Sequence, residues 1–310
     1  MRIFMTGATG YIGTAVLGAL VRAGHAVTVL VRTQDKAREL AGPGVTPCLG
    51  DLSDPAGYTR LAAGHDAYVL AAFDSSSRRV ELDRMAIENL VRVARAELGK
   101  QQAAQRALIY TSGVWVLGNT PQPAAEDAAT APVEHVAWRP GHERLVLEAC
   151  GEGLRTVVVR PGIVYGGTRG IVCDLFRDAS NGLIRIFGTG DNHWPLVYDR
   201  DLGDLYARLV ARGDADGVFH ANDEGDERVN DIVAAIRSHF AVDPAVRYVP
   251  LVEARAKHGT YAIALALDQV VRSPRARALG WVPSLTSVSG NLTRLLGEWR
   301  AGSSTPGLRR

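Results

Sequence analysis

The chain has 310 residues, of which 46% are hydrophobic, enough to bury a substantial core in one large domain or two coupled lobes. Lysine and arginine total 35 against 33 aspartates and glutamates, and this net charge of +2 argues against nucleic acid or an anionic membrane as a partner. The three cysteines lie far apart without CxxC spacing, and no apolar run reaches the ~20 residues that span a bilayer. We therefore expect no metal site, no membrane anchor and a cytoplasmic location.

The first thirty residues predict a strand, a glycine-rich turn, a helix and a second strand. An apolar run at 2–5 precedes the segment Thr6 to Gly13, apolar residues then recur at helical spacing as far as Gly24, and a β-branched run follows at 27–31. This order is typical of the βαβ unit of a parallel sheet.

The alternation of strands and helices continues along the chain. We expect strands at 68–71, 108–110, 156–160 and 217–221, and helices at 81–98, 143–149 and 200–212. Residues 229–300 predict two or three further helices and little strand. The strands are continuous apolar runs, as in a sheet covered on both faces, so the predicted fold class is α/β, a Rossmann-type doubly wound parallel sheet with a smaller C-terminal substrate lobe.

The domain boundaries follow from where this alternation loosens, after Pro161. The expected divisions are a dinucleotide-binding domain at 1–165 to which 196–222 return, a substrate lobe at 166–195 and 223–300, and a flexible tail at 301–310.

The turn after the first strand carries glycines at positions 7, 10 and 13. In this context the first glycine permits the tight turn, the second lets the backbone approach a pyrophosphate, and the third allows close helix–strand packing. The diphosphate would lie at the helix N-terminus, where free N–H groups and the helix dipole favour an anion. The predicted cofactor-binding residues of this turn are Gly7, Thr9, Gly10, Tyr11, Ile12 and Gly13.

The end of the second strand indicates the choice of cofactor. An NAD site places a carboxylate there for the ribose hydroxyls, whereas this chain has Arg32, followed by Lys36 and Arg38. A guanidinium binds a 2′-phosphate well, so we predict NADP(H) in preference to NAD(H).

Further motifs extend the pattern over most of the chain. They are the segments Gly50 to Leu52, Ala71-Ala72, Tyr110 to Gly113, Arg160 to Gly166 and Val197 to Leu202. With the glycine turn, they make the chain resemble the extended branch of the short-chain dehydrogenase/reductase superfamily, which holds sugar-nucleotide epimerases, dehydratases and flavonoid-type reductases.

The resemblance implies roles for several residues around the cofactor. Asp51 and Leu52 would flank the adenine, and Ala71 and Ala72 would line the cofactor cleft. The segment that contains Pro161, Gly162 and Val164 would run beside the nicotinamide. Thr111 and Arg139 complete the expected cofactor contacts.

The catalytic set of the resembled family is altered in this chain. That family uses Tyr-x-x-x-Lys and a preceding Ser or Thr, and the tyrosine donates a proton to the substrate oxygen. Our alignment places His135 at the tyrosine position and Arg139 at the lysine position. Gly113 takes the place of the catalytic Ser or Thr, which leaves Ser112 and Thr111 as the nearest hydroxyls.

Three functions are compatible with this combination. The first is a reductase of a small carbonyl, imine or conjugated substrate, with the proton delivered by His135 or by His193, and with Arg139 holding the cofactor ribose or phosphate. The second is an epimerase or dehydratase with a tightly held cofactor, and the third is a non-catalytic protein that responds to NADP(H). The expected partner is a small molecule, and a homodimer is compatible with the family.

Overall fold

The computed structural model describes residues 1–98, 105–151 and 153–303. They form two compact units. The first unit comprises Met1–Ser112, Trp138–Arg160 and Leu202–Phe219, and the second comprises Gly113–Ala137, Pro161–Asp201 and His220–Arg310. This division differs from the sequence-based one, because it assigns 113–137 and 161–165 to the second unit and returns only 202–219 to the first.

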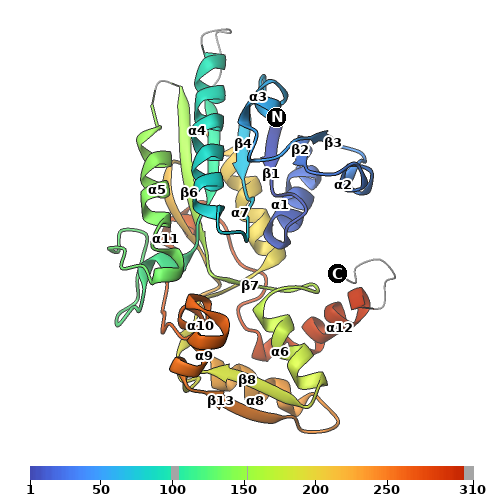
Figure 1. Cartoon of the computed structure of the whole chain (residues 1–310), viewed down its shortest axis with the longest axis vertical. Helices are drawn as coiled ribbons and strands as arrows, with labels where there is room; N and C mark the ends of the chain where they lie inside the picture. Colours follow the sequence, from blue (N-terminus) through green and yellow to red (C-terminus); the bar gives the residue numbers. More distant parts are fainter. Residues whose placement is uncertain (99–104, 152, 304–310) are drawn as a thin grey trace. The chain divides into compact units, whose positions relative to one another are not determined.

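A parallel sheet with helices on both faces makes up most of the first unit, which confirms the doubly wound Rossmann-type fold (Figure 1). The strand order is β11-β6-β5-β4-β1-β2-β3. The elements in chain order are β1 (Arg2–Thr6), α1 (Tyr11–Arg22), β2 (Ala26–Val31), α2 (Gln34–Leu40), β3 (Val45–Leu49), α3 (Pro55–Ala62), β4 (Ala67–Leu70), α4 (Arg79–Leu98), β5 (Arg106–Thr111), α5 (Arg139–Glu148), β6 (Leu154–Pro161), α7 (Asp199–Ala211) and β11 (Gly217–Ala221).

The strand register brings the ends of several strands to one edge. Thr6, the last residue of β1, is level with Leu30 of β2 and with Leu70 of β4, and Leu70 is level with Tyr110 of β5. The glycine turn and the residues just after β2, β4 and β5 therefore meet at the carboxyl edge, where open α/β sheets bind their ligands.

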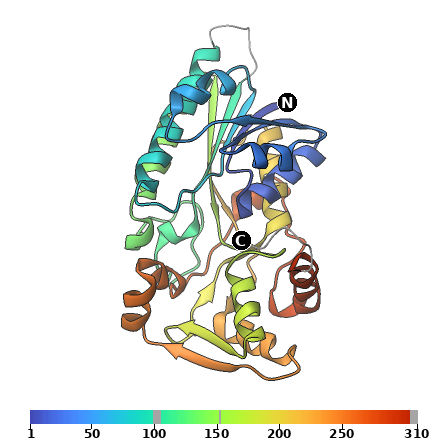
Figure 2. The same cartoon turned by 45° about the vertical axis from the view of Figure 1, so that its right-hand side comes forward.

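Two layers of helices cover this sheet, as the turned view in Figure 2 shows. The layer that contains α3, α4 and α5 packs on one face through a buried apolar cluster that includes Tyr58, Leu90 and Val146. Helices α1 and α7 lie on the other face. They approach closely, because a Cβ atom on Gly203 of α7 would lie 2.7 Å from the carbonyl oxygen of Ala15 in α1.

Sequence periodicity missed one strand of this sheet. The strand β3 pairs in parallel with β2, but it contains Pro47 and alternates between half-buried and exposed positions. Its place at the end of the strand order explains both features, since an edge strand tolerates proline and needs no continuous apolar run.

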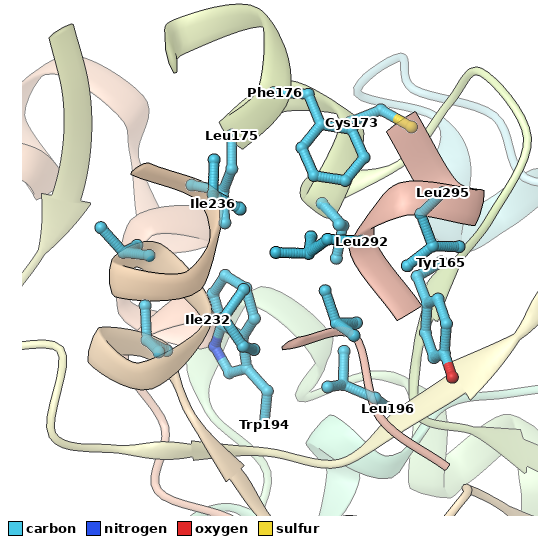
Figure 3. Packing of buried hydrophobic residues seen from close by; sticks show 14 of the residues in the cluster. Tyr165, Cys173, Leu175, Phe176, Trp194, Leu196, Ile232, Ile236, Leu292 and Leu295 are labelled. Atoms are coloured by element: carbon cyan, nitrogen blue, oxygen red, sulfur yellow. The ribbon is translucent and has the colours of Figure 1, made fainter. Parts of the chain in front are cut away.

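The second unit combines short strands with helices around a separate apolar core. Its elements are η1 (Val114–Leu117), η2 (Glu134–Val136), β7 (Ile163–Tyr165), α6 (Ile171–Ser180), β8 (Leu183–Phe187), β9 (His193–Trp194), β10 (Leu196–Tyr198), β12 (Glu227–Arg228), α8 (Val229–Ser238), β13 (Ala245–Val249), α9 (Leu251–His258), α10 (Thr260–Leu265), α11 (Pro274–Ala278), η3 (Ser289–Asn291) and α12 (Leu292–Ser303). Figure 3 shows the core, whose buried side chains include Phe176, Trp194, Ile232 and Leu292.

The C-terminal part holds more structure than its sequence pattern predicts. Residues 229–300 contain the helices α8 to α12, where two or three were expected, whereas the expectation of little strand holds, because β13 is the one strand in this range. The strand β13 is largely exposed and pairs in parallel with β8, so its residues lack the apolar run that marks a buried strand. Of the tail expected at 301–310, residues 301–303 belong to α12, and 304–310 lie outside the described residues.

No helix in the described ranges combines the length and the apolar character needed to cross a membrane.

Candidate functional site

The turn between β1 and α1 contains three glycines, and the packing of the protein itself requires two of them. Gly7 has a φ of +79°, and a Cβ atom there would lie 2.3 Å from the backbone nitrogen of Ala72. A Cβ atom on Gly13 would lie 1.9 Å from the carbonyl oxygen of Gly7. The turn is thus packed against the end of β4, and α1 is packed against the turn.

Gly10 has ordinary backbone geometry, with φ −75° and ψ 169°, and a Cβ atom there would meet only the carbonyl oxygen of Gly7, at 3.2 Å. Packing within the protein therefore gives little reason for glycine at this exposed position. A ligand that approaches the backbone closely, such as a pyrophosphate in this kind of turn, would explain why a side chain is absent here.

The N-terminus of α1 suits an anion. Gly10 is its N-cap residue, so no side chain caps the first N–H groups, and the first turn holds no acidic residue. Thr14 instead donates from its Oγ1 atom to the carbonyl oxygen of Gly10 at 2.8 Å. Thr9 is exposed, and Tyr11 and Ile12 are half-buried. The turn therefore fits a nicotinamide dinucleotide, with its diphosphate at the N–H groups of these residues.

Arg32 follows β2 at the same edge and is exposed. The two neighbouring cations are already engaged, since Lys36 pairs with Glu39 at 2.5 Å and Arg38 pairs with Asp35. Within the described ranges, no carboxylate lies at ion-pair distance from Arg32. Of the three cations that the sequence places here, Arg32 is the one available to a phosphate.

Asp51 lies beyond β3 and is half-buried. Its Oδ1 atom accepts hydrogen bonds from the backbone nitrogen of Ser53 at 2.8 Å and from the hydroxyl of Ser53 at 2.6 Å. These bonds, with a further contribution from the charge of Arg32, lower the pKa of Asp51. Leu52, next to it, packs against the apolar cluster under α3 and α4. Asp51 is therefore a fixed carboxylate near Arg32.

Ala71 and Ala72 continue from β4 beside the glycine turn. The backbone nitrogen of Ala71 donates to the carbonyl oxygen of Thr6 at 3.2 Å, and both alanines are half-buried. Their backbone atoms lie against the turn, since a Cβ atom on Gly7 would lie 2.5 Å from the carbonyl oxygen of Ala71.

Arg139 is the first residue of α5 and is half-buried. Its guanidinium donates to the carbonyl oxygen of Thr111 at 3.0 Å and to the hydroxyl of Tyr110 at 3.3 Å. It also lies over the Trp138 ring, 4.5 Å from the centroid, and 5.8 Å from that of Phe73. The structure thus brings Arg139 and Thr111 together at the end of β5, while the Thr111 hydroxyl contacts the Tyr206 hydroxyl at 2.6 Å.

A polar network behind Arg139 was missed by sequence reasoning. Asp83 of α4 accepts hydrogen bonds from the Tyr110 hydroxyl at 2.8 Å and from Nδ1 of His142 at 2.7 Å. Burial, and next the charge of Asp83, raise the pKa of Tyr110 well above its ordinary value. Tyr110 therefore stays neutral and orients Arg139. In the sequence, the one sign of this network was that Asp83 and His142 occupy helix faces that are otherwise apolar.

Ser112 is turned into the protein interior. Its hydroxyl donates to Oε1 of Glu143 at 2.5 Å, and Glu143 pairs with Arg160 at 2.6 Å. The side chains of Glu143 and Arg160 are only 3% and 6% exposed. The Ser112 hydroxyl is thus engaged with a buried ion pair, and we assign it no contact with a substrate.

In the second unit, His135 lies in η2 within an aromatic cluster. Its ring packs against Trp115 and Tyr261, with centroid separations of 6.0 Å and 5.6 Å, and Trp115 and Tyr261 lie 5.9 Å apart. Nδ1 of His135 lies 3.1 Å from the hydroxyl oxygen of Thr260. The sequence predicted His135, but gave no sign that Thr260 and Tyr261 adjoin it.

His193 lies on β9, in a group of side chains at the surface. Its Nδ1 atom lies 2.8 Å from Oδ1 of Asp268, and Arg228 of the adjacent strand lies 3.4 Å from its Nε2 atom. Both ring nitrogens thus have neighbours in the same unit. The structure does not bring His193 into the cluster that holds His135.

The segment expected beside the nicotinamide begins where β6 ends at Pro161. Gly162 donates from its backbone nitrogen to the carbonyl oxygen of Ala221 at 2.9 Å. A Cβ atom on Gly162 would lie 2.3 Å from the carbonyl oxygen of Pro195, so this position needs glycine for packing. Val164 is buried in β7, which pairs in parallel with β10. The backbone of this segment is therefore firmly held within the second unit.

Comparison with known proteins identifies the family. A family model described as NAD(P)H-binding matches residues 7–174. The chain belongs to this family. The resemblance to extended short-chain dehydrogenases/reductases is confirmed with it. The uncharacterized protein C2A9.02 of Schizosaccharomyces pombe is 30% identical over 300 residues, which are 94% of this chain and 98% of that protein.

Two other comparisons are informative. The 4-hydroxy-2-methyl-3-oxo-4-farnesyl-3,4-dihydroquinoline-1-oxide ketoreductase of Stigmatella aurantiaca is 31% identical over 171 residues, 54% of this chain and 51% of that enzyme. The structure of human epimerase family protein SDR39U1 with NADPH has a TM-score of 0.73 at 21% identity, and the match covers 98% of this chain and 100% of that one. At this identity the likeness shows the shared fold.

Proposed function

We propose that this NAD(P)H-binding family member is an NADPH-dependent reductase of a small organic substrate that carries a carbonyl, an imine or a conjugated double bond. The observation that carries the proposal lies at one sheet edge. A glycine turn there leaves room for a diphosphate, and the exposed Arg32 forms no ion pair with a carboxylate of the described residues.

The residues of the first unit define how the cofactor would be held. The N–H groups at the start of α1 would bind the diphosphate, and Arg32 would bind the 2′-phosphate. Arg139, fixed at the end of β5 by Thr111, would bind the ribose or its phosphate. When bound, the dinucleotide would supply the hydride.

Reduction is favoured over epimerisation by the chemistry of the remaining groups. Arg139 stands where the resembled family has lysine, and a guanidinium stays protonated and does not act as a base. Epimerases and dehydratases rely on a tyrosine base activated by that lysine, whereas hydride transfer depends more on positioning and exclusion of water. The Stigmatella relative is named a ketoreductase, which supports the same choice.

The test compares Arg32→Asp with Arg38→Asp as a matched control, because Arg38 is a nearby exposed arginine already paired with Asp35. Calorimetric titration should show NADPH binding weakened ~10-fold or more by Arg32→Asp, since a hydrogen bond to a charged group contributes ~1.5–3 kcal/mol. NADH binding should change much less, and Arg38→Asp should affect neither nucleotide. Equal losses for NADPH and NADH would refute the cofactor assignment.

Turnover separates the alternatives. The proposal expects oxidation of NADPH that depends on a member of a panel of ketones, quinones, cyclic imines and enones. Tight NADPH binding without turnover of any panel member would instead support a non-catalytic binding protein. Purification with a non-exchanging nucleotide, together with an epimerised sugar-nucleotide product, would support an isomerase.

A further inference from the structure

The guanidinium of Arg139 is held along one edge. Both hydrogen bonds that it makes with described residues come from Nη1, one to the carbonyl oxygen of Thr111 and one to the hydroxyl of Tyr110. Among the residues that the structure describes, none accepts a hydrogen bond from its Nε or Nη2 group. Its centre lies over the Trp138 ring, which supports the plane of the guanidinium. A fixed guanidinium with one unoccupied edge suits a phosphate or a pair of hydroxyls.

The hydroxyl of Tyr110 can accept this bond because its own proton is directed elsewhere. A phenol has one proton, and Tyr110 donates it to Oδ2 of Asp83 at 2.8 Å. A carboxylate only accepts, so the lone pairs of the phenolic oxygen are left for Arg139. Without Asp83, the phenolic proton could turn towards the guanidinium and oppose its N–H groups. Asp83 thus sets the direction of the hydrogen bonds that end at Arg139.

Asp83 lies on α4 and contacts the start of α5. Its Oδ2 atom also accepts a hydrogen bond from Nδ1 of His142 at 2.7 Å, and both side chains are nearly buried. Arg139 and His142 belong to the first turn of α5, which holds no acidic residue and no side-chain cap. The helix dipole disfavours a cation at this end of a helix. The carboxylate of Asp83 supplies, from the neighbouring helix, the negative charge that α5 itself lacks there.

The strand order places Arg139 and Arg32 on opposite sides of the glycine turn. The turn follows β1, and Arg32 follows β2 on one side of it. Thr111, which holds Arg139, ends β5, two strands away on the other side. Because neighbouring strands lie about 4.8 Å apart, β1 and β5 are separated by roughly 10 Å. With a diphosphate at the turn and a 2′-phosphate at Arg32, Arg139 is on the side of the nicotinamide half.

We propose that Asp83 is a positioning residue for the dinucleotide, which acts through Tyr110 to hold Arg139 against the nicotinamide half. The inference rests on the proposed function. The nucleotide would contact the Nε and Nη2 edge of Arg139, whereas Asp83 would act only through the hydrogen bonds behind it. Removal of Asp83 should therefore weaken the contacts of the nicotinamide half and leave those of the adenine half intact.

The test titrates two ligands by calorimetry. They are NADPH and adenosine 2′,5′-bisphosphate, which has the adenine half with its 2′-phosphate and lacks the nicotinamide riboside. Asp83→Leu removes the acceptor, and Tyr110→Phe removes the hydroxyl while its ring stays in the core. Each should weaken NADPH binding ~3- to 10-fold, the range for one lost hydrogen bond, and leave the bisphosphate affinity unchanged. Glu88→Gln is the matched control, because Glu88 lies on the same helix and pairs with Arg84 in solvent.

Two further variants separate positioning from support of the fold. Asp83→Asn keeps one carbonyl oxygen that can accept from both Tyr110 and His142, so NADPH affinity should return to within ~2-fold of the wild type. The double variant of Asp83→Leu and Arg139→Met should bind NADPH no more weakly than Arg139→Met alone, because the residue through which Asp83 acts is then absent.

The results that would overturn the assignment are distinct from those that would overturn the proposed function. Equal losses for NADPH and the bisphosphate, or additive losses in the double variant, would mean that Asp83 does not act through Arg139. Wild-type NADPH affinity in Asp83→Leu and Tyr110→Phe would also overturn the assignment, and the NADPH-dependent reductase would stand. If the wild type itself does not bind NADPH, the proposed function fails, and the positioning role fails with it.

Discussion

The guanidinium of Arg139 and the carbonyl oxygen of Thr111 are joined by a 3.0 Å hydrogen bond that ties the start of α5 to the end of β5. Because the same guanidinium also contacts the hydroxyl of Tyr110, its position is set by two groups of one strand. The cation therefore stays at the carboxyl edge of the sheet, the edge that also carries the glycine turn.

Replacement of Arg139 by methionine should weaken NADPH binding ~10-fold, because the positioned charge at this edge is lost while much of the side-chain volume remains. Fluorescence titration with NADPH measures the effect. Arg144→Met is the control, since Arg144 lies on the same helix with its side chain 74% exposed. Indistinguishable dissociation constants for the two variants would show that Arg139 takes no part in holding the nucleotide.

Breaking the ion pair between Glu143 and Arg160 should lower the free energy of unfolding far more than breaking the pair one turn along α5. Glu143→Gln leaves the buried Arg160 guanidinium uncompensated and should lower the free energy of unfolding by about 3–5 kcal/mol. Glu148 of the same helix pairs with Arg144 in solvent, at 3.8 Å, and Glu148→Gln should cost less than about 1 kcal/mol. Urea unfolding of both variants decides the matter, and similar midpoints would contradict the account.

Asp223 should make the protein less stable as the pH rises towards neutrality. Burial is the main cause that raises its pKa to about 7, and its Oδ2 atom accepts a 3.1 Å hydrogen bond from Tyr165. Between the ordinary value near 4 and about 7, the folded state binds more protons than the unfolded state, so the free energy of unfolding falls as pH increases through this window.

Asp223→Asn removes this titration and keeps a side chain of the same shape. Melting temperatures of the variant and the wild type, measured from about pH 5 to about pH 8, should diverge with increasing pH in favour of the variant. Asp199, whose pKa burial raises to about 6, contributes a slope of the same sign to both proteins and cancels in the difference. Parallel curves would contradict a raised pKa of Asp223 in the folded protein.

The parts of the site that were predicted from sequence are those whose residues are close along the chain. Gly7, Gly10 and Gly13 form one turn, and their spacing after a β-branched strand determines the local geometry without any distant contact. Arg32 follows from the same βαβ unit. Arg139 required only an alignment to the resembled family, and the structure places it at the sheet edge.

The rest depends on contacts between distant residues. His135 and Thr260 are 125 positions apart, and no sequence motif around either residue predicts their contact. Ser112 was expected near the reacting groups because it adjoins Gly113, which aligns with the catalytic Ser or Thr of the resembled family. Its direction is instead set by Glu143 and Arg160, which only the folded sheet brings to it. Hydrophobic periodicity predicts which face of a helix or strand a residue occupies, but not which side chain it contacts there.

The turn after β1, as the binding site of a diphosphate, is the feature on which the proposed function depends most. Calorimetric titration of NADPH into the wild type and into Gly10→Ala tests it directly, because the added Cβ meets only one protein atom, at 3.2 Å. The wild type should bind one NADPH per chain, and Gly10→Ala should fold with nearly unchanged stability but bind NADPH at least ~10-fold more weakly. No binding to the wild type, or equal affinities for the two proteins, would contradict the claim.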